Sequence, residues 1–276
     1  MKSTAETVAL ADLVNARLAA PSPLIGLSVA VVGCGAVGSR LILDLIRCGA
    51  GLSDRPMLVI DPDTFEPPNL ARHILPISAL GEFKAQAMAD ETRRLHPSAS
   101  VEPVVGSVFN LIDRLAGYDL VIDATGANPV ALRLNEEAVS WRKSGRGFPP
   151  IIHAAVHGNG LAVQTILVTD VRHACLKCLR PGHGLFKADP LRPGTPTTSR
   201  PAACGDGGHV PYAAAAPAMA AALAVQTALE WAGKAADPGP RVRTRVLNAE
   251  LTSPAKDRNW PVDPACPACQ RPADEQ

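Results

Sequence analysis

The chain has few aromatic residues, little charge bias and no long apolar run, and each absence excludes a class of protein. Aromatic residues make up only 4% of the 276 residues, so a buried core must consist mainly of aliphatic side chains. The formal net charge of +1 argues against a strongly basic nucleic-acid binder and against a protein that binds anionic membranes. No apolar run reaches the roughly 18 residues that a membrane-spanning helix needs. We therefore expect neither a nucleic-acid partner nor a membrane association.

The pattern of a secretory signal is also missing. Residues 1–23 contain Glu6 and Asp12, and their leucines form one stripe, which predicts an amphipathic N-terminal helix instead. The seven cysteines are odd in number, which argues against a disulfide framework. A cytoplasmic location is therefore expected.

Short apolar runs alternate with helical patterns between residues 28 and 155. The runs are rich in β-branched residues and predict strands at 28–32, 57–61, 101–105, 119–123 and 151–155. Strands that alternate with helices predict an α/β fold with a Rossmann-like, doubly wound, mostly parallel sheet. Two later runs, 160–169 and 242–247, predict an antiparallel extension of that sheet. Between them, the alanine-rich segment 213–231 predicts a helix that is buried or lies at a subunit interface.

A glycine-rich turn follows the first expected strand. Gly33, Gly35 and Gly38 form the pattern G-x-G-x-x-G and open a helix, so the turn can approach phosphates closely and the helix N-terminus can attract them. Asp61 ends the second strand, where a carboxylate can accept hydrogen bonds from ribose hydroxyls. These features fit NAD and ATP equally well.

The residues that follow the second strand separate the two nucleotides. Asp63, Asn69, Arg72 and Lys84 lie in or directly after this loop. Hydride transfer by NAD does not require fixed cationic side chains such as Arg72 and Lys84. A triphosphate does, because such cations neutralise the charge that develops at phosphorus. Asp123 ends the fourth strand, and a carboxylate near phosphates needs a cation, so Mg²⁺ is predicted there.

Four motifs carry a family resemblance. Asp-Pro-Asp-(x)5-Asn-Leu-x-Arg at 61–72, Gly-x-x-Lys at 81–84, His-Pro at 96–97 and Asp-Ala-Thr at 123–125 resemble the ThiF/MoeB/HesA family, the adenylating core of ubiquitin-activating E1 enzymes. The resemblance covers residues 24–276, which are expected to form one adenylation domain. The Asn-Leu-Ala-Arg-His and Asp-Ala-Thr motifs are most similar to E1 modules of bacterial ubiquitin-like conjugation operons, including antiphage ones. Thiamine and molybdopterin enzymes usually carry Gln after that Arg and Asp-Asn after that Thr.

This resemblance implies an E1-like adenylyltransferase that binds ATP, Mg²⁺ and the C-terminal carboxylate of a ubiquitin-like, β-grasp protein. It implies an acyl-adenylate product, release of pyrophosphate, a homodimer and an E2-like protein as a further partner. By position, Asp61 would hold the ribose, and Asn69, Arg72 and Lys84 would contact the phosphates. Arg72 would stabilise the transition state, and Asp123 would hold Mg²⁺.

Four of the seven cysteines form two C-x-x-C pairs, Cys175 with Cys178 and Cys266 with Cys269. Two such loops can supply four thiolates to a tetrahedral zinc ion, and a closed four-thiolate site is structural rather than catalytic. The family resemblance supports zinc. The alternative is four free buried cysteines.

Cys204 lies apart from these pairs. It belongs to a segment rich in Pro and Gly, residues 180–212, which is expected to be a long crossover loop. In the family, a cysteine of this region accepts the acyl group as a thioester or carries sulfur, so Cys204 is the candidate nucleophile. Arg200 or His209 could lower the pKa of its thiol. The alternative is an inert loop cysteine.

Two other functions stay open at this point. An NAD-dependent oxidoreductase would share the glycine loop and Asp61, but it would leave the two cations and the paired cysteines unexplained. A non-catalytic E1-like half would bind a partner and complete the site of another subunit, and the retained cations argue against it. His153 and His157, at the end of the fifth expected strand, are predicted to be packed or solvated rather than catalytic.

Overall fold

The centre of the fold is a seven-stranded sheet. The computed structural model describes residues 15, 20–182, 186–201, 208–234 and 237–270. Most of the N-terminal helix expected over 1–23 lies outside the described residues, as does Cys204. The strands of the sheet are β1 (Val29–Val32), β2 (Met57–Ile60), β3 (Val101–Val104), β4 (Leu120–Asp123), β5 (Ile151–His157), β6 (Ala162–Val168) and β9 (Val242–Val246). A separate small hairpin pairs β7 (Arg200–Pro201) with β8 (Gly208–His209).

The helices connect these strands and cover the sheet. The α-helices are α2 (Ala36–Arg47), α3 (Lys84–Leu95), α4 (Ile112–Leu115), α5 (Asn128–Lys143), α6 (Leu176–Leu179), α7 (Ala215–Gly233) and α8 (Pro267–Gln270). Three short 3₁₀ helices are η1 (Pro67–Asn69), η2 (Ile77–Ala79) and η3 (Val108–Leu111). Among the helices of the described residues, none is both long enough and apolar enough to cross a bilayer.

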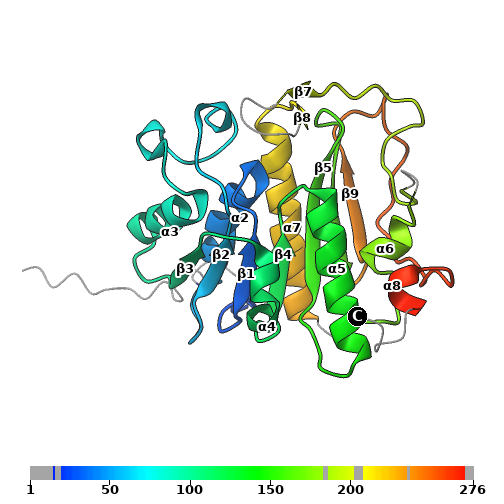
Figure 1. Ribbon diagram of the computed structural model, residues 1–276, viewed down its shortest axis with the longest axis horizontal. Helices are drawn as coiled ribbons and strands as arrows, with labels where there is room; N and C mark the ends of the chain where they lie inside the picture. The colour runs from blue at the N-terminus through cyan, green and yellow to red at the C-terminus, as the bar shows by residue number, and fades with distance from the viewer. Residues whose placement is uncertain (1–14, 16–19, 183–185, 202–207, 235–236, 271–276) are drawn as a thin grey trace, which may run out of the picture.

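The strands follow the order β3-β2-β1-β4-β5-β6-β9 (Figure 1). Neighbours from β3 to β5 pair in parallel, whereas β6 pairs antiparallel with both β5 and β9. The expected Rossmann-like, mostly parallel sheet with an antiparallel C-terminal extension is therefore confirmed. The order of the strands reverses between β1 and β4, and the carboxyl ends of strands at such a reversal are the typical place for a ligand.

Helices cover both faces of the sheet. α2 and α7 pack together on one face, and α5 lies on the other, in front of the sheet in Figure 1. Val31 belongs to the core beneath α2 and α7, whereas Val32 belongs to the core beneath α5. Because both faces are covered, β1 and β2 are apolar at every position.

Two helices show how local sequence fits the fold. α5 begins at Asn128, and Pro129 occupies its first turn, where the missing N–H costs nothing. α7 is buried between α2 and the sheet, and its alanines Ala220 and Ala224 are fully buried. Small side chains let the two helices approach closely, so the apolar character of α7 is explained by packing within the chain.

Candidate functional site

The glycine turn closes at the carboxyl end of β1 through contacts that no other residue type allows. Gly33 has φ +93°, and a Cβ added there would lie 2.8 Å from the backbone nitrogen of Thr125. A Cβ on Gly38 would lie 1.8 Å from the carbonyl oxygen of Gly33, so the first turn of α2 packs directly on the loop. A Cβ on Gly35 would meet no described atom within 4 Å. Two glycines therefore shape the turn, and the third leaves open space beside the start of α2.

Asp61 and His73 tie neighbouring loops to this turn. The backbone N–H of Cys34 donates to Asp61 Oδ2 at 2.6 Å, and the N–H of Asp63 donates to Oδ1 at 2.9 Å. Burial raises the pKa of the Asp61 carboxyl, against the effect of these two donors. His73 Nδ1 accepts from the N–H of Leu75 at 3.1 Å, so Nε2 carries the proton and donates to the Cys34 carbonyl at 2.6 Å. Burial lowers the pKa of His73 to about 4.

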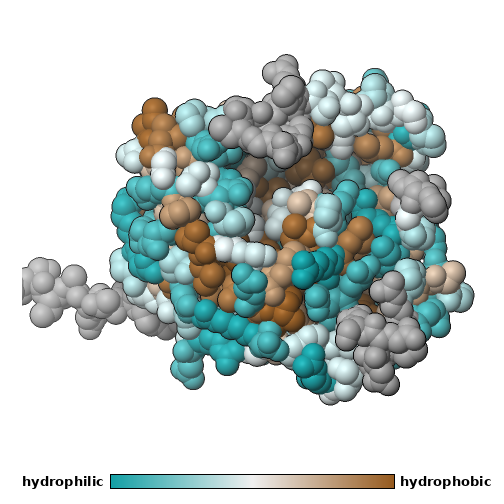
Figure 2. Space-filling view, in the orientation of Figure 1, coloured by the Kyte–Doolittle hydropathy of each residue, from teal (hydrophilic) through white to brown (hydrophobic). Residues whose placement is uncertain are grey.

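A cavity of about 420 Å³ opens above the turn, and Figure 2 shows this face of the molecule hollowed near its middle. Its polar wall includes Gly33, Gly35, Asp61, Asp63, Asn69, Arg72, Lys84, Ser107 and Thr125. Lys84 is buried to 8% exposure, and its Nζ lies 2.9 Å from Asp63 Oδ2. The Asn69 side chain accepts from the N–H of Glu66 at 3.0 Å, which fixes the loop that carries Arg72. The cavity therefore combines a glycine turn, two carboxylates and two cations.

Part of the wall of this cavity is apolar. Its lining includes Val32, Ile60, Val108, Phe109 and Val130. The guanidinium carbon of Arg133, on α5, lies 3.9 Å from the centre of the Phe109 ring. Stacking of a cation on the ring holds Phe109 at the wall, where a flat, apolar ligand group could pack against it.

A second cavity of about 460 Å³ adjoins the first. Both are lined by Gly35, Ala36, Arg72, Thr125, Ala127 and Tyr212. The rest of its wall is small and apolar, namely Val37, Ala124, Gly126, Ala154, Val156, Gly158 and Val210. The Arg72 guanidinium lies 5.4 Å from the centre of the Tyr212 ring, so these two side chains mark the junction of the two cavities.

Asp123 lies beside the cavities but lines neither of the two. Its Oδ1 accepts from the backbone N–H of Thr125 at 3.0 Å and from the Thr125 hydroxyl at 2.7 Å. Its Oδ2 lies 2.8 Å from Nδ1 of His153, and both side chains are almost fully buried. The magnesium role of Asp123 stays a prediction; its carboxylate accepts one hydrogen bond on Oδ2 and two on Oδ1, which leaves a lone pair on Oδ2. The carboxylates that line the nucleotide cavity, and so fit a magnesium ion there, are Asp61 and Asp63.

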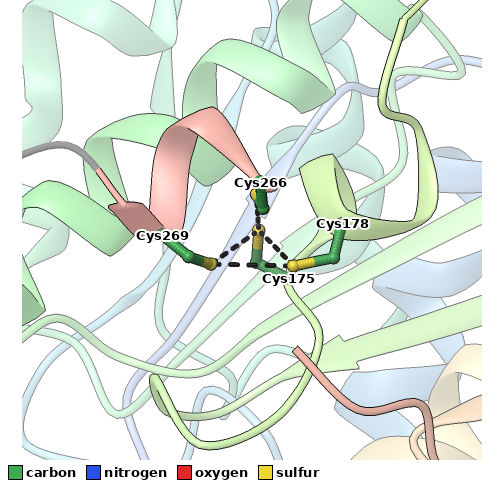
Figure 3. Close-up of side chains that lie close together, drawn as sticks. All are labelled: Cys175, Cys178, Cys266 and Cys269. Carbon is green, nitrogen blue, oxygen red and sulfur yellow. Dashed lines mark hydrogen bonds between the residues drawn. The ribbon is translucent and has the colours of Figure 1, made fainter. Parts of the chain in front are cut away.

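The four paired cysteines come together at the other side of the molecule, where α6 meets α8 (Figure 3). Neighbouring sulfur atoms lie 3.6–3.8 Å apart, and all four lie within 4.8 Å of one another. Zinc–sulfur bonds of about 2.3 Å in a tetrahedron imply sulfur–sulfur distances of about 3.8 Å, so the thiols fit a zinc ion. Hydrogen bonds among the thiols, that of Cys175 first, lower the pKa of Cys266 to about 7. The predicted four-cysteine cluster is confirmed, and it joins segments 91 residues apart.

The structure thus brings together most of the residues expected around a nucleotide and keeps the cysteine cluster apart from them. Sequence reasoning missed Tyr212 and Phe109 in the cavity wall and the pairing of His153 with Asp123. The pairing had a signal, because 119–123 and 151–155 were expected as consecutive strands of a mostly parallel sheet, and in the structure Asp123 and His153 face each other across β4 and β5. Tyr212 and Phe109 had none, because each reaches the site from a loop or short helix whose path no sequence pattern fixes.

Comparisons with known proteins agree with this fold. A family model described as "ThiF family" matches residues 21–270. The "ATP-dependent ubiquitin transferase-like protein Cap2" of Pseudomonas aeruginosa is 32% identical over 252 residues, which cover 89% of this chain and 43% of that protein. The "Adenylyltransferase and sulfurtransferase UBA4" of Lodderomyces elongisporus is 30% identical over 188 residues, 66% of this chain and 36% of that protein.

Among solved structures, E. coli MccB crystallised with succinimide covers 90% of this chain with a TM-score of 0.66 at 18% identity, and the match spans 67% of that chain. This likeness shows the fold. The chain spans less than half the length of the curated relatives it matches. The matched region contains all seven strands of the sheet and both C-x-x-C pairs, and this chain belongs to the ThiF family.

Proposed function

We propose that this chain is an E1-like adenylyltransferase that uses ATP to activate the C-terminal carboxylate of a ubiquitin-like protein. The observation that carries the proposal is the junction of two cavities at Arg72. One cavity has the groups that a nucleoside triphosphate needs. The other is lined almost entirely by small, uncharged residues and suits the extended end of a polypeptide. The similarity to Cap2, a ubiquitin transferase-like protein, and to UBA4, an adenylyltransferase and sulfurtransferase, supports the same chemistry.

The residues of the first cavity suit the parts of a nucleotide. The open space at Gly35 and the first turn of α2 suit phosphates. Asp61 uses each oxygen for one backbone N–H and keeps lone pairs for ribose hydroxyls. The base would pack against apolar wall residues such as Phe109. Mg²⁺ would neutralise part of the triphosphate charge, and Asp61 and Asp63 are the carboxylates of this wall that could help to hold it.

The reaction needs positioning and charge neutralisation rather than acid–base catalysis. A carboxylate oxygen of the peptide end attacks the α-phosphorus, and the bond from that phosphorus to the bridging oxygen breaks. The electron pair leaves with pyrophosphate, and the acyl-adenylate remains. Arg72, at the cavity junction, and Lys84, held at the wall by Asp63, meet the charge that develops on the phosphates.

The later steps rest on the family resemblance. The thiolate of Cys204 attacks the acyl carbon, a thioester forms, and AMP leaves with the electron pair of the broken acyl–phosphate bond. An E2-like protein would then accept the acyl group. A homodimer and a cytoplasmic location stay predictions of the same kind.

Pyrophosphate exchange tests the first step. The full chain is incubated with ATP, Mg²⁺ and candidate ubiquitin-like proteins, each intact or lacking its last two residues. We expect exchange only with an intact C-terminus, and a loss of at least about 100-fold in Arg72→Ala. Arg47→Ala is the matched control, because Arg47 is exposed on α2 and pairs only with Asp44 in the described structure. No exchange with any candidate, together with reduction of NAD by small substrates, would contradict the proposal.

Cys204→Ala separates the second step from the first. Exchange should persist in this variant, and a thioester that hydroxylamine or thiols cleave should disappear. A thioester that survives the substitution rules out Cys204 as the nucleophile. Cys48→Ala serves as the control, because Cys48 is a half-buried free cysteine at the end of α2.

A further inference from the structure

One side chain holds two points of the long connection between α6 and α7. Asn159 lies in the turn between β5 and β6, beyond the last pair of that hairpin, His157 and Ala162. Its Nδ2 donates to the carbonyl oxygen of Thr198 at 3.0 Å and to that of Pro211 at 2.9 Å. Its Oδ1 accepts from the N–H of Thr198 at 2.8 Å. Asn159 therefore joins the turn to residues 39 and 52 positions further along the chain.

The asparagine amide is well suited to these three contacts. Toward Thr198 it presents a donor and an acceptor side by side, as a backbone peptide group would, and its second N–H hydrogen reaches Pro211. An aspartate at this position would offer acceptors only, and a glutamine would carry the same groups one methylene further out. Both donors of the side chain are thus used, and each holds a different part of the connection.

Two glycines let the connection pack closely on the same turn. Gly158 and Gly160 flank the asparagine and have φ values of +56° and +81°. A Cβ on Gly160 would lie 3.1 Å from the Cβ of Tyr212 and 3.2 Å from that of Ala216, at the start of α7. A Cβ on Gly158 would lie 3.3 Å from Cδ1 of Leu191. The turn is therefore in direct contact with the connection on several sides.

The segments that Asn159 ties together form part of the wall of the second cavity. Gly158 precedes Asn159, Val210 and Tyr212 flank Pro211, and these three neighbours all line that cavity. Asn159 itself lines neither of the two large cavities. Its effect on a ligand must therefore pass through the position of this wall.

The nucleotide cavity depends much less on this contact. Of the three wall residues, only Tyr212 also lines the first cavity. The space expected to receive phosphates, beside Gly35, is shaped by the packing of Gly33 against Thr125 and not by the β5–β6 turn. A change at Asn159 should therefore be felt in the second cavity and hardly in the first.

We propose that Asn159 is a positioning residue for the second cavity: it fixes the connection between α6 and α7 to the β5–β6 turn and so sets the wall that the end of the substrate polypeptide meets. The inference rests on the proposed function for the identity of that polypeptide. The hydrogen bonds and the position of the wall can be tested without any substrate.

The first experiment follows amide hydrogen exchange and backbone signals by NMR in the protein without ligand. In Asn159→Ala the amide of Thr198 loses its acceptor, so its hydrogen should exchange several times faster. The amide signals of Val210 and Tyr212 should shift, because Pro211 between them loses its donor. In Asn159→Asp the Thr198 amide should stay protected, since a carboxylate still accepts, while the signals of Val210 and Tyr212 should again shift.

The second experiment measures pyrophosphate exchange against the concentration of a ubiquitin-like protein that supports it in the parent. Asn159→Ala should raise the half-saturating concentration of that protein by about tenfold, the effect of one or two lost hydrogen bonds. Asn159→Asp should raise it at least as much, because its carboxylate faces the carbonyl oxygens of Thr198 and Pro211 without a donor. The maximal rate, the half-saturating ATP concentration and the AMP affinity should stay within about threefold of the parent.

Asn259→Ala is the matched control. Asn259 also joins two segments through its side chain, since its Oδ1 accepts from the N–H of Arg241 at 2.9 Å, but it lines neither large cavity. This variant should leave the signals of Val210 and Tyr212 and the half-saturating concentration of the ubiquitin-like protein unchanged. An equal rise in Asn259→Ala would show that general destabilisation causes the effect, and it would overturn the inference.

Other results would also overturn the inference. Unchanged hydrogen exchange at Thr198 in Asn159→Ala would mean that the hydrogen bond does not hold the connection. An unchanged half-saturating concentration in Asn159→Asp would mean that the two donors do not position the wall, and a parallel loss of AMP affinity would place the effect in the nucleotide cavity. Absence of exchange in the parent with every candidate would instead contradict the proposed function, and the NMR results would still decide whether Asn159 sets the wall.

Discussion

The nucleotide cavity and the cysteine cluster are built on opposite plans. Around the cavity, the backbone sets the geometry: two glycines close the turn, hydrogen bonds of Asp61 and His73 hold the neighbouring loops, and Arg72 lies at the junction of the two cavities. At the cluster, the side chains come first, because α6 and α8 are four-residue helices held against each other by sulfur contacts. The geometry of the cavity suits a ligand that binds reversibly, whereas the cysteine cluster suits a structural metal ion that stays bound.

The two regions should also differ in how far their stability depends on a bound ligand. Buried aliphatic side chains on both faces of the sheet form the two cores around β1, so we expect nucleotide binding to add to a structure already formed. Four thiols crowded within 4.8 Å gain little from one another unless a metal ion binds them. The C-terminal segment beyond β9 should therefore depend on zinc, whereas the sheet should not.

Removal of zinc should lower the free energy of unfolding more than any other change, and it should have only a small effect on nucleotide affinity. Cys178→Ser should lower the zinc content from one ion per chain to none and reduce the free energy of unfolding by about 4 kcal/mol, because the tetrahedral ligand set is broken. AMP affinity should change by less than about threefold. Metal analysis, thermal unfolding and calorimetry measure the three quantities, with Cys48→Ser as the control. A parallel loss of AMP binding would show that the two regions are coupled.

Two substitutions within the glycine turn should separate the effect on the conformation of the turn from the effect on AMP binding. Gly38→Ala places a methyl group 1.8 Å from the Gly33 carbonyl, so the loop must move; we expect about 3 kcal/mol lower stability and no measurable AMP binding. Gly35→Ala meets only open space and should leave stability within about 0.5 kcal/mol while it weakens AMP binding. Urea unfolding and calorimetry test the pair. Normal AMP affinity in Gly35→Ala would place the phosphates elsewhere.

Acid should weaken the fold through two buried histidines, one beneath the glycine turn and one at the end of β5. Burial lowers the pKa of His73, beneath the glycine turn, and of His157, on β5, to about 4 from an ordinary 6.5. The unfolded chain takes up protons near pH 6.5 that the folded chain takes up only near 4. Stability is therefore complete above about 6.5 and falls as the pH drops, by about 2 kcal/mol per histidine at pH 5. In His157→Leu the loss between pH 6.5 and 5 should shrink by that amount in urea unfolding at saturating zinc. An unchanged slope would contradict the assignment.

Much of the cavity could be predicted from the sequence, because its residues follow strand ends directly. Gly33 and Asp61 come immediately after apolar strands of a parallel sheet, so the topology alone brings them together. The cysteine cluster was also predictable, since C-x-x-C spacing sets two ligands on one short loop. In both cases a local pattern carries the information.

The rest depends on contacts that no local pattern contains. The orientation of Asp123 is decided by His153 on the neighbouring strand and by the turn at Thr125, and the sequence shows only that a carboxylate ends β4. The magnesium role that the sequence suggests for this side chain stays a prediction; in the described structure the carboxylate contacts Thr125 and His153 and lines neither of the two large cavities. Tyr212 reaches the cavity from the segment before α7, and its position depends on the path of a long connection.

The two tyrosines of the chain allow the smallest effect to be isolated. Each ring lies beneath an arginine: Tyr212 lies 5.4 Å from Arg72 at the cavity junction, and Tyr118 lies 5.2 Å from Arg55 away from it. A cation–π contact of about 1 kcal/mol holds Arg72 in place, so Tyr212→Leu should lower kcat/KM in pyrophosphate exchange by about fivefold. Tyr212→Phe keeps the ring and should stay within about twofold. Tyr118→Phe and Arg55→Ala probe the second pair and should leave exchange unchanged at equal thermal stability. If the Arg55 variant lowered exchange as much as Tyr212→Leu, the loss would reflect a general destabilisation of the fold. The contact between Tyr212 and Arg72 would then not be what holds Arg72 in place.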